Sequence, residues 1–308
     1  MSRHVVVLMG GWSAEREVSL TSGRAIVEAC QRLGYRATGL DMGHDVAQRL
    51  AELKPDVVFN ALHGTPGEDG SIQGVLELMG IPYTHSGITT SAVAIDKQLT
   101  KTVLTAAGIQ MPGGGVVRSE SVFEADPLPR PYVLKPVNEG SSVGVAIVTD
   151  DSNFGQPISR DAAGPWRQFE TLLAEPFIRG RELTVAVLDD EPLAVTELQP
   201  TRGFYDYDAK YTEGLTQHVV PAPIHPQATE QALAMALAAH RALGCRGVSR
   251  SDFRYDDTMG EPGQLYLLEV NTQPGMTPLS LVPEQAKYRQ IGFDALVDRL
   301  IQDAGLKR

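Results

Sequence analysis

The chain has 308 residues, of which 42% are hydrophobic and 21% are charged, a composition typical of a globular protein with a sizeable core. A formal net charge of −11 argues against a surface for nucleic acid or for an anionic membrane, because both partners require clustered positive charge. No apolar run approaches the ~20 residues of a membrane-spanning helix, and we expect the first apolar run not to be a signal peptide. We therefore expect a cytoplasmic protein.

Residues 1–95 alternate between strand and helix, the order that produces a parallel sheet flanked by helices. We expect strands at 4–9, 35–40, 56–61 and 81–85, and helices at 13–33, 45–54 and 71–79. The first strand-to-helix turn reads Gly-Gly-Trp-Ser over 10–13. Its amides favour an anion, but its glycines lack the spacing of a dinucleotide site, so a Rossmann dehydrogenase is a poor fit.

Two polar side chains of this segment are candidate ligand contacts. Glu15 stands in the first turn of a predicted helix, where a carboxylate either interacts with the helix dipole or receives a ligand amine. His63 follows the third strand, and ligands of open parallel sheets bind at the carboxyl ends of strands. Taken singly, neither residue decides between a structural and a functional role.

Beyond residue 95 the pattern changes, and we place a domain boundary there. Strands are expected at 131–136, 145–148, 172–178, 182–188, 248–255 and 264–271, and helices at 89–107, 228–243 and 293–304. The two cysteines, Cys30 and Cys245, are too few for a disulfide framework or a zinc site, and we expect them to be buried small hydrophobes.

A glycine-serine loop, Asn-Glu-Gly-Ser-Ser-Val-Gly over 138–144, follows a strand that ends near Lys135. A Walker P-loop would lead from strand into helix and carry Gly-Lys-Ser/Thr, which this loop does not. The loop is therefore either a hairpin that lays amides and hydroxyls over phosphates or an ordinary surface hairpin.

Two further stretches suit a nucleotide site. Pro176 in the strand at 172–178 indicates an edge or a hinge, and the free backbone of an edge strand can pair with an adenine ring. An acid such as Glu182 can bond a ribose. Residues 200–217 are polar and aromatic without a clean period, which is typical of an active-site lid, and Lys210-Tyr211 is its most interesting pair.

The strands near the C-terminus should pair as an antiparallel hairpin. A register that places Asp252 opposite Glu269 also places Arg250 opposite Asn271, with all four side chains on one face. Two carboxylates and an amide suit Mg²⁺, which is usually held by one or two carboxylates together with substrate phosphates. A solvent-facing ladder of salt bridges is the alternative.

Six motifs in order make nearly the whole chain resemble a D-alanine–D-alanine ligase of the ATP-grasp superfamily. They are GGWSAEREVS (10–19), LHG (62–64), EGSSVG (139–144), YDYDAKY (205–211), SRSDF (249–253) and LLEVNTQPGMTPLSLVP (267–283). The resemblance implies an α/β fold with a Rossmann-like N-terminal domain (1–95) and two α+β ATP-grasp subdomains (96–180 and 181–308). It implies ATP-dependent ligation of two D-alanine molecules through an acyl phosphate, for peptidoglycan precursors, by a homodimer.

The resemblance also assigns roles to the matched residues. ATP would be bound by Lys97, Lys135, Ser142, Glu175, Phe177, Ile178, Glu182 and Lys210. Two Mg²⁺ ions, which Mn²⁺ can replace, would be bound by Asp252, Glu269 and Asn271. The D-alanine substrates would contact Glu15, His63, Tyr211, Arg250, Gly275, Ser280 and Leu281. Ser141 and Tyr211 would close the lid against Glu15, while Arg250 and the Gly275 amide would stabilise the oxyanion.

Two positions depart from the family pattern, and two other functions stay open. Leu279 stands where a histidine can precede the serine, and Pro176 stands where a lysine is common. The chain could instead be an ATP-grasp ligase for another amino or hydroxy acid, although Tyr211 favours dipeptide formation. It could also be a non-catalytic nucleotide-binding regulator, which would have no need of the oxyanion donor Arg250.

Overall fold

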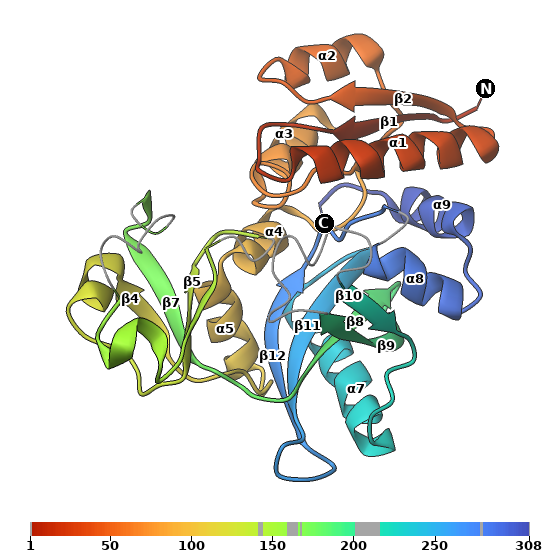
Figure 1. Cartoon of the computed structure of the whole chain (residues 1–308). Helices are drawn as coiled ribbons and strands as arrows, with labels where there is room; N and C mark the ends of the chain where they lie inside the picture. The colour runs from red at the N-terminus through yellow and green to blue at the C-terminus, as the bar shows by residue number, and fades with distance from the viewer. Residues whose placement is uncertain are drawn as a thin grey trace.

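The computed structural model describes residues 2–140, 144–158, 166, 168–200, 216–277 and 280–307, and it contains three sheets with helices on their faces (Figure 1). Ser141, Ser142, Lys210 and Tyr211 of the predicted site lie outside these residues, as does Leu279. None of the helices within the described ranges combines the length and apolar character needed to cross a membrane.

The N-terminal sheet is parallel, as the alternation of strand and helix predicts. Its strands are β1 (His4–Met9), β2 (Arg36–Asp41) and β3 (Val57–Asn60) in the order β2-β1-β3, and its helices are α1 (Arg16–Arg32), α2 (Val46–Leu53) and α3 (Ser71–Met79). Alternate residues of the buried strand β1 face opposite layers, since Val5 packs with α1 and Val6 packs with α2 and α3. The sheet is thus covered on both faces.

Two predicted elements of this region are wrong in detail. The strand expected at 81–85 is reduced to isolated bridges of Tyr83 with Val58 and Gly305. The single helix expected at 89–107 is two helices, α4 (Ile88–Ile95) and α5 (Lys97–Ala106). Asp96 between them is extended, and its carboxylate accepts hydrogen bonds from the amides of the second and third residues of α5 at 2.9 Å. This capping competes with helix continuation.

The central sheet is antiparallel in the order β4-β7-β5-β6. Its strands are β4 (Gly115–Arg118), β5 (Tyr132–Pro136), β6 (Ala146–Val148) and β7 (Thr171–Pro176), with 3₁₀ turns η1 (Ser119–Phe123) and η2 (Ser152–Gly155) beside them. Since β7 pairs with neighbours on both sides, its interpretation as an edge strand is wrong. Pro176 is its last residue, where the absent amide costs no ladder bond, and the hinge alternative stays a prediction.

The C-terminal sheet is antiparallel in the order β10-β9-β8-β11-β12. Its strands are β8 (Arg181–Leu188), β9 (Glu191–Pro200), β10 (Thr216–Val219), β11 (Val248–Asp256) and β12 (Gln264–Asn271). Helix α7 (Pro226–Leu243) lies between β10 and β11 in the chain, and helices α8 (Leu281–Tyr288) and α9 (Phe293–Asp303) come after β12. Alanines of α7 and Leu104 of α5 fill one face of the sheet. The other face shares a core with α8, α9 and β1.

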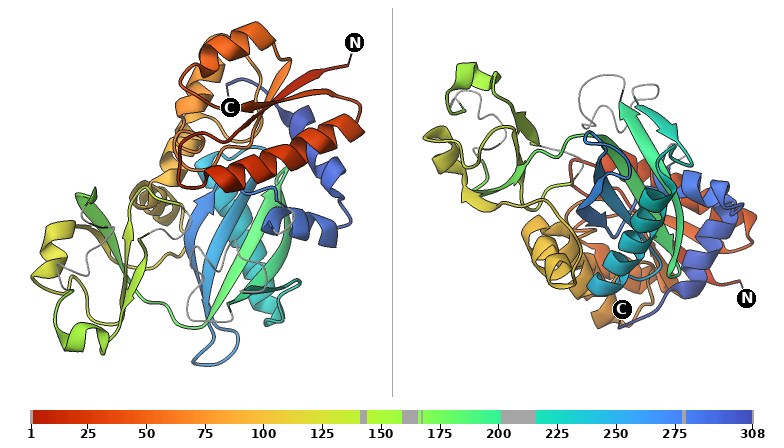
Figure 2. Two further views of the ribbon diagram at one scale, coloured as in Figure 1. Left: turned by 45° about the horizontal axis from the view of Figure 1, so that its top comes forward. Right: turned by 90° about the horizontal axis from the view of Figure 1, so that it is seen from below.

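Figures 1 and 2 show how these layers are arranged. The N-terminal sheet lies over one end of the C-terminal sheet, and α9 returns the end of the chain to the N-terminal helices. The central sheet stands to one side, with α4 and α5 at the junction. The space between the central and C-terminal sheets is where the predicted nucleotide residues meet.

Candidate functional site

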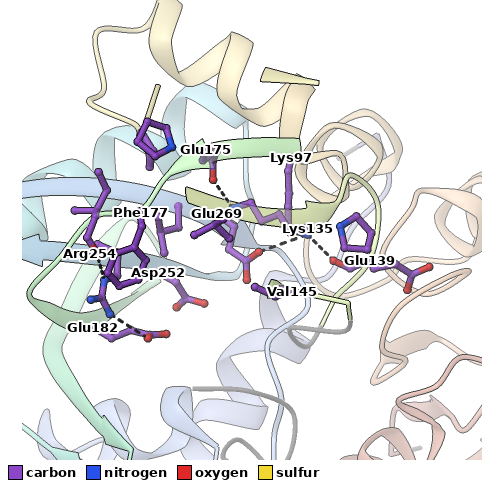
Figure 3. Close-up of a pocket in the computed structure, with 16 residues that line it drawn as sticks. Lys97, Lys135, Glu139, Val145, Glu175, Phe177, Glu182, Asp252, Arg254 and Glu269 are labelled. Carbon is purple, nitrogen blue, oxygen red and sulfur yellow. Dashed lines mark hydrogen bonds and ion pairs between the residues drawn. The ribbon is translucent and has the colours of Figure 1, made fainter. Parts of the chain in front are cut away.

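A cavity of about 820 Å³, open to solvent, lies between the central and C-terminal sheets (Figure 3). Eight of the predicted residues line it: Lys97, Lys135, Glu175, Phe177, Ile178, Glu182, Asp252 and Glu269. They come from α5, β5, β7, the linker after β7, β8, β11 and β12. Val133, Val145 and Leu268 add apolar walls, so the cavity combines apolar surface with a few charged groups, as small-molecule sites do.

Lys97 reaches the cavity because it is the first residue of α5. Its ammonium donates to the carbonyl of Glu139 and lies 3.6 Å from the Glu269 carboxylate. The side chain is almost buried, at 9% exposure, so its charge lies among protein groups rather than in bulk water. Such a cation is suited to phosphate oxygens at the same position.

Glu175 is held between two lysines inside the cavity wall. Its Oε2 lies 2.7 Å from Lys135 Nζ, and its Oε1 accepts from Lys101 Nζ, also at 2.7 Å. Lys101 donates further to the carbonyl of Gly113 at 2.7 Å. The cluster has one carboxylate for two ammonium groups, so positive charge remains at the cavity. Lys101 was missed in the sequence, although its spacing of four from Lys97 places both on one face of α5.

The hairpin of β11 and β12 confirms the predicted register, with Asp252 opposite Glu269 and Arg250 opposite Asn271. The register shifts after Asp252, and bulges of this kind commonly redirect side chains near active sites. Arg250 forms a bidentate pair with Asp252, at 2.8 Å from Nε to Oδ1 and 2.7 Å from Nη2 to Oδ2. Thr184 Oγ1 donates to Asp252 Oδ1 at 2.6 Å. The predicted oxyanion donor therefore lies beside a predicted metal ligand.

The predicted metal ligands have the right chemistry for a hard cation. Asp252 and Glu269 line the cavity, and Asn271 is two residues beyond Glu269 on the same strand. Within the described part of the chain, no cluster of three or more His, Cys, Asp or Glu side chains is arranged to hold a metal ion. A cation here would thus rely on the Asn271 amide and on phosphate oxygens as well, which matches the habit of Mg²⁺.

Glu15 lies at the start of α1, close to the glycine-serine loop. Its carboxylate is 9% exposed and makes no capping bond to the helix amides. A Cβ atom on Gly140 would lie 3.0 Å from Glu15 Oε2, and one on Gly64 would lie 3.4 Å from it. Glycine at both positions lets the two backbones approach the carboxylate, which joins the N-terminal domain to the loop beside the cavity.

His63 is buried at the carboxyl end of the N-terminal sheet, as predicted. Its Nδ1 lies 3.4 Å from the Glu68 carboxylate. Burial works to lower the pKa of His63, but the bond to Glu68 and the charges of Glu68 and Glu15 outweigh it, with help from the Gln273 carbonyl, so the pKa is raised. Burial and the Glu15 charge raise the pKa of Glu68 against the lowering effect of His63. The cluster thus places the carboxylates of Glu15 and Glu68 near one buried imidazole.

The loop after β12 brings Gly275 and Ser280 together. A Cβ atom on Gly275 would lie 2.8 Å from Ser280 Oγ, and Ser280 Oγ accepts from the amide of Thr277 at 2.9 Å. Leu281 is buried against Leu198 of β9. Neither Gly275 nor Ser280 lines the cavity of Figure 3.

The same loop is tied to the N-terminal sheet by a buried amide pair. Gln273 Nε2 donates to the carbonyl of Asn60, the last residue of β3, and Asn60 Nδ2 donates to Gln273 Oε1 at 3.2 Å. This pair fixes the start of the predicted second-substrate loop close to the strand end that precedes His63.

Comparisons with known proteins agree with this arrangement. The model described as "D-ala D-ala ligase C-terminus" matches residues 117–302, and the model described as "D-ala D-ala ligase N-terminus" matches residues 41–86. Proteins named D-alanine–D-alanine ligase from Sphingopyxis alaskensis and Rhizorhabdus wittichii are 66% and 65% identical over 301 residues, which cover 98% of this chain and 97% and 96% of theirs.

Solved structures show the same fold. A crystal structure of D-alanine–D-alanine ligase from Bacillus anthracis has a TM-score of 0.83 at 30% identity, and one of that enzyme complexed with ATP has 0.82 at 27% identity. Each alignment covers 98% of this chain and 97% of the other. The ATP-grasp α/β fold expected from the sequence motifs is confirmed.

Proposed function

This chain belongs to the D-alanine–D-alanine ligase family, and from that premise we propose how its residues carry out the ligation. The enzyme is an ADP-forming ligase that joins two D-alanine molecules with ATP, a reaction that serves peptidoglycan precursor synthesis in its family. The observation that carries the residue assignment is the convergence of Lys97, Lys135, Asp252 and Glu269 on one cavity.

ATP occupies that cavity with its nucleoside toward the linker after β7. Phe177 and Ile178 contact the base there, Glu175 accepts from it, and Glu182 accepts from the ribose. The phosphates extend toward Lys97 and Lys135, whose ammonium groups supply the positive charge. Ser141, Ser142 and Lys210 complete the phosphate contacts, on the strength of the sequence motifs alone.

Two Mg²⁺ ions, or Mn²⁺ in their place, are held by Asp252, Glu269 and Asn271 together with the phosphates. When bound, they neutralise charge on the transferring phosphoryl group, which is most of what this reaction asks of a protein. Asp252 and Glu269 are close to cations already, Arg250 for the first and Lys97 for the second.

In the first step, a carboxylate oxygen of the first D-alanine attacks the γ-phosphorus of ATP, and ADP leaves. Glu15 receives the ammonium group of this substrate, beside the buried pair of His63 and Glu68. The product is an acyl phosphate, in which phosphate is a good leaving group at the acyl carbon. The carboxylate itself would be a poor electrophile.

In the second step, the amine of the second D-alanine attacks the acyl carbon, and phosphate leaves. Ser280 and Leu281 hold the carboxylate of this substrate, while Arg250 and the Gly275 amide stabilise the oxyanion. Losing one such donor typically costs about 10²–10³ in rate. Acyl phosphates hydrolyse, so closure of the lid by Ser141 and Tyr211 against Glu15 excludes water.

The division into a substrate domain (1–95) and two ATP-grasp parts (96–180 and 181–308) remains our proposal. Helix α5 belongs by sequence to the second part but packs on the sheet of the third, with Leu104 in that core. We also propose a cytoplasmic homodimer, on the strength of the family resemblance.

Oxygen labelling tests this mechanism. D-alanine labelled with ¹⁸O in its carboxylate is incubated with the enzyme, ATP and Mg²⁺, and the released phosphate and nucleotide are analysed by mass spectrometry. An acyl phosphate places one ¹⁸O in inorganic phosphate for each dipeptide formed, because the carboxylate oxygen leaves with phosphorus. Label in AMP would show an acyl adenylate instead and would contradict the mechanism.

A further inference from the structure

The linker between β7 and β8 runs along the cavity and is held close to β11. It spans residues 177–180, and the Phe177 amide donates to the carbonyl of Pro131 at 3.1 Å. Gly180 has a φ of +87°, and a Cβ atom there would overlap the carbonyl oxygen of Tyr255 on β11. Only glycine allows this close crossing, so the path of the linker is fixed at its β8 end.

Arg254 of β11 fixes the rest of the linker. Its Nε donates to the carbonyl of Ile178 at 3.1 Å, and its Nη2 donates to the carbonyl of Gly180 at 2.7 Å. Its guanidinium carbon lies 5.6 Å from the centre of the Phe177 ring. Figure 3 shows Arg254 beside Phe177 and its ion pair to Glu182, in which Nη1 and Oε2 are 3.6 Å apart.

These contacts use the planar fork of an arginine. A guanidinium presents its donors in fixed directions, so one side chain can serve two carbonyls and a carboxylate together, whereas a lysine is a point charge on a flexible stem. The side chain is 16% exposed. Burial lowers the pKa of Arg254, and Glu182 and Asp256 counteract this, but an arginine remains charged at neutral pH.

Arg254 lies at the proposed nucleoside end of the cavity rather than at the proposed phosphate end. Arg254 donates to the carbonyls of Ile178 and Gly180 and pairs with Glu182. These contacts lie in the part of the cavity proposed to surround the base and the ribose. Lys97 and Lys135 supply the positive charge elsewhere in the cavity. Among the cations that line the cavity, Arg254 is the one that donates to the linker carbonyls.

We propose that Arg254 is a positioning residue for the nucleoside of ATP, one that holds the linker backbone against β11 and sets the Glu182 carboxylate at the ribose. The inference rests on the proposed function, because it assumes that the nucleoside lies at this end of the cavity. Its consequence is that the preference for ribose over deoxyribose depends on Arg254 as well as on Glu182.

The test measures the dissociation constants of ATP and 2′-deoxy-ATP by calorimetry, with Mg²⁺ present, for the wild type and for Arg254→Met. We expect the variant to bind ATP at least about tenfold more weakly, since charge-assisted hydrogen bonds are lost. We expect the dissociation constant of 2′-deoxy-ATP divided by that of ATP to fall toward one in the variant. In steady-state assays, kcat and the KM for D-alanine should stay within about twofold of the wild type. The reason is that the lost contacts stabilise bound ATP equally in the ground state and in the transition state.

A matched control is Arg181→Met. Arg181 is the neighbour of Tyr255 across the β8–β11 ladder, and its guanidinium carbon lies 5.6 Å from the centre of that ring. It is absent from the cavity lining, and its partners are Glu197, Asp257 and the carbonyl of Pro223. Its loss should lower the melting temperature without changing the affinity for either nucleotide.

A second variant, Arg254→Lys, keeps the positive charge and removes the planar fork of donors. Its dissociation constant for ATP and its nucleotide ratio should lie between those of the wild type and Arg254→Met. This variant keeps the test decisive if Arg254→Met folds poorly. Unchanged ATP affinity and an unchanged nucleotide ratio in the Arg254 variants would overturn the inference. So would equal changes in Arg181→Met. A wild type that binds ATP but forms no dipeptide would overturn the proposed function instead, and the nucleotide ratios would still decide the role of Arg254.

Discussion

The buried carboxylate of Glu175 is paired with two lysines at the wall of the cavity. A carboxylate at 3% exposure is costly to bury alone, but here two lysines approach its two oxygens at 2.7 Å each. Lys135 lines the cavity and Lys101 does not. Lys101 can therefore keep the carboxylate paired while Lys135 turns to a nucleotide.

The first prediction concerns this cluster. Lys101→Met leaves Glu175 with one lysine and should lower the free energy of unfolding by about 1–3 kcal/mol, measured by urea denaturation. The exposed Lys287→Met on α8 is the control and should change it by no more than about 0.5 kcal/mol.

The double variant Lys101→Met/Glu175→Gln separates this pairing from a general loss of packing. Removal of both charges leaves no unpaired group between these two positions, so the double variant should be more stable than the sum of the single effects by at least about 0.5 kcal/mol. Strict additivity would show that Lys101 does not act through Glu175.

Site residues could be predicted where the pattern is local. Asp252 and Arg250 are two apart on one strand, and so are Glu269 and Asn271, so alternation alone places them on one face. The same alternation includes Arg254, but its role could not be predicted because its partners at the linker are more than 70 residues away in the chain. Lys101 meets Glu175 across 74 residues, a contact that only the folded chain creates.

At the scale of elements, the pairing of β11 with β12 could be predicted, since two alternating strands and a polar turn leave few registers, but the register shift after Asp252 could not. Strands β4, β9 and β10 and helix α8 were not predicted. Residues 191–200 are buried along most of their length, and a strand buried on both faces lacks alternation. Helix α8 is short and contains a proline, which weakens its helical pattern.

The break between α4 and α5 gives the element-scale prediction. Asp96→Ala removes the acceptor for two amides at the start of α5 and should cost about 1 kcal/mol of stability. Lys97 is the next residue, so the same change should also raise the KM for ATP. Asp96→Asn keeps an oxygen acceptor, so its loss of unfolding free energy, measured by denaturation, should be less than half that of Asp96→Ala. An Asp96→Ala variant with wild-type stability would show that the cap does not stabilise the helix.

At the scale of the whole molecule, the C-terminal helix α9 packs against the N-terminal helix α1. Arg32 of α1 makes a bidentate pair with Asp294 of α9, and the Tyr35 hydroxyl donates to Asp298 at 2.6 Å. The C-terminal helix thus completes the core of the N-terminal domain, which no local pattern predicts. The sequence motifs located the cavity residues, but the packing of three sheets decides which of them meet.

The central claim is that this molecule joins two D-alanine molecules with one ATP. The most direct measurement is the joint quantification of dipeptide and ADP after incubation with D-alanine, ATP and Mg²⁺, with L-alanine and D-lactate mixtures run in parallel. We predict one ADP for each D-alanyl-D-alanine, with little product from the other substrates. Absence of dipeptide, or ATP turnover that does not depend on D-alanine, would contradict the account.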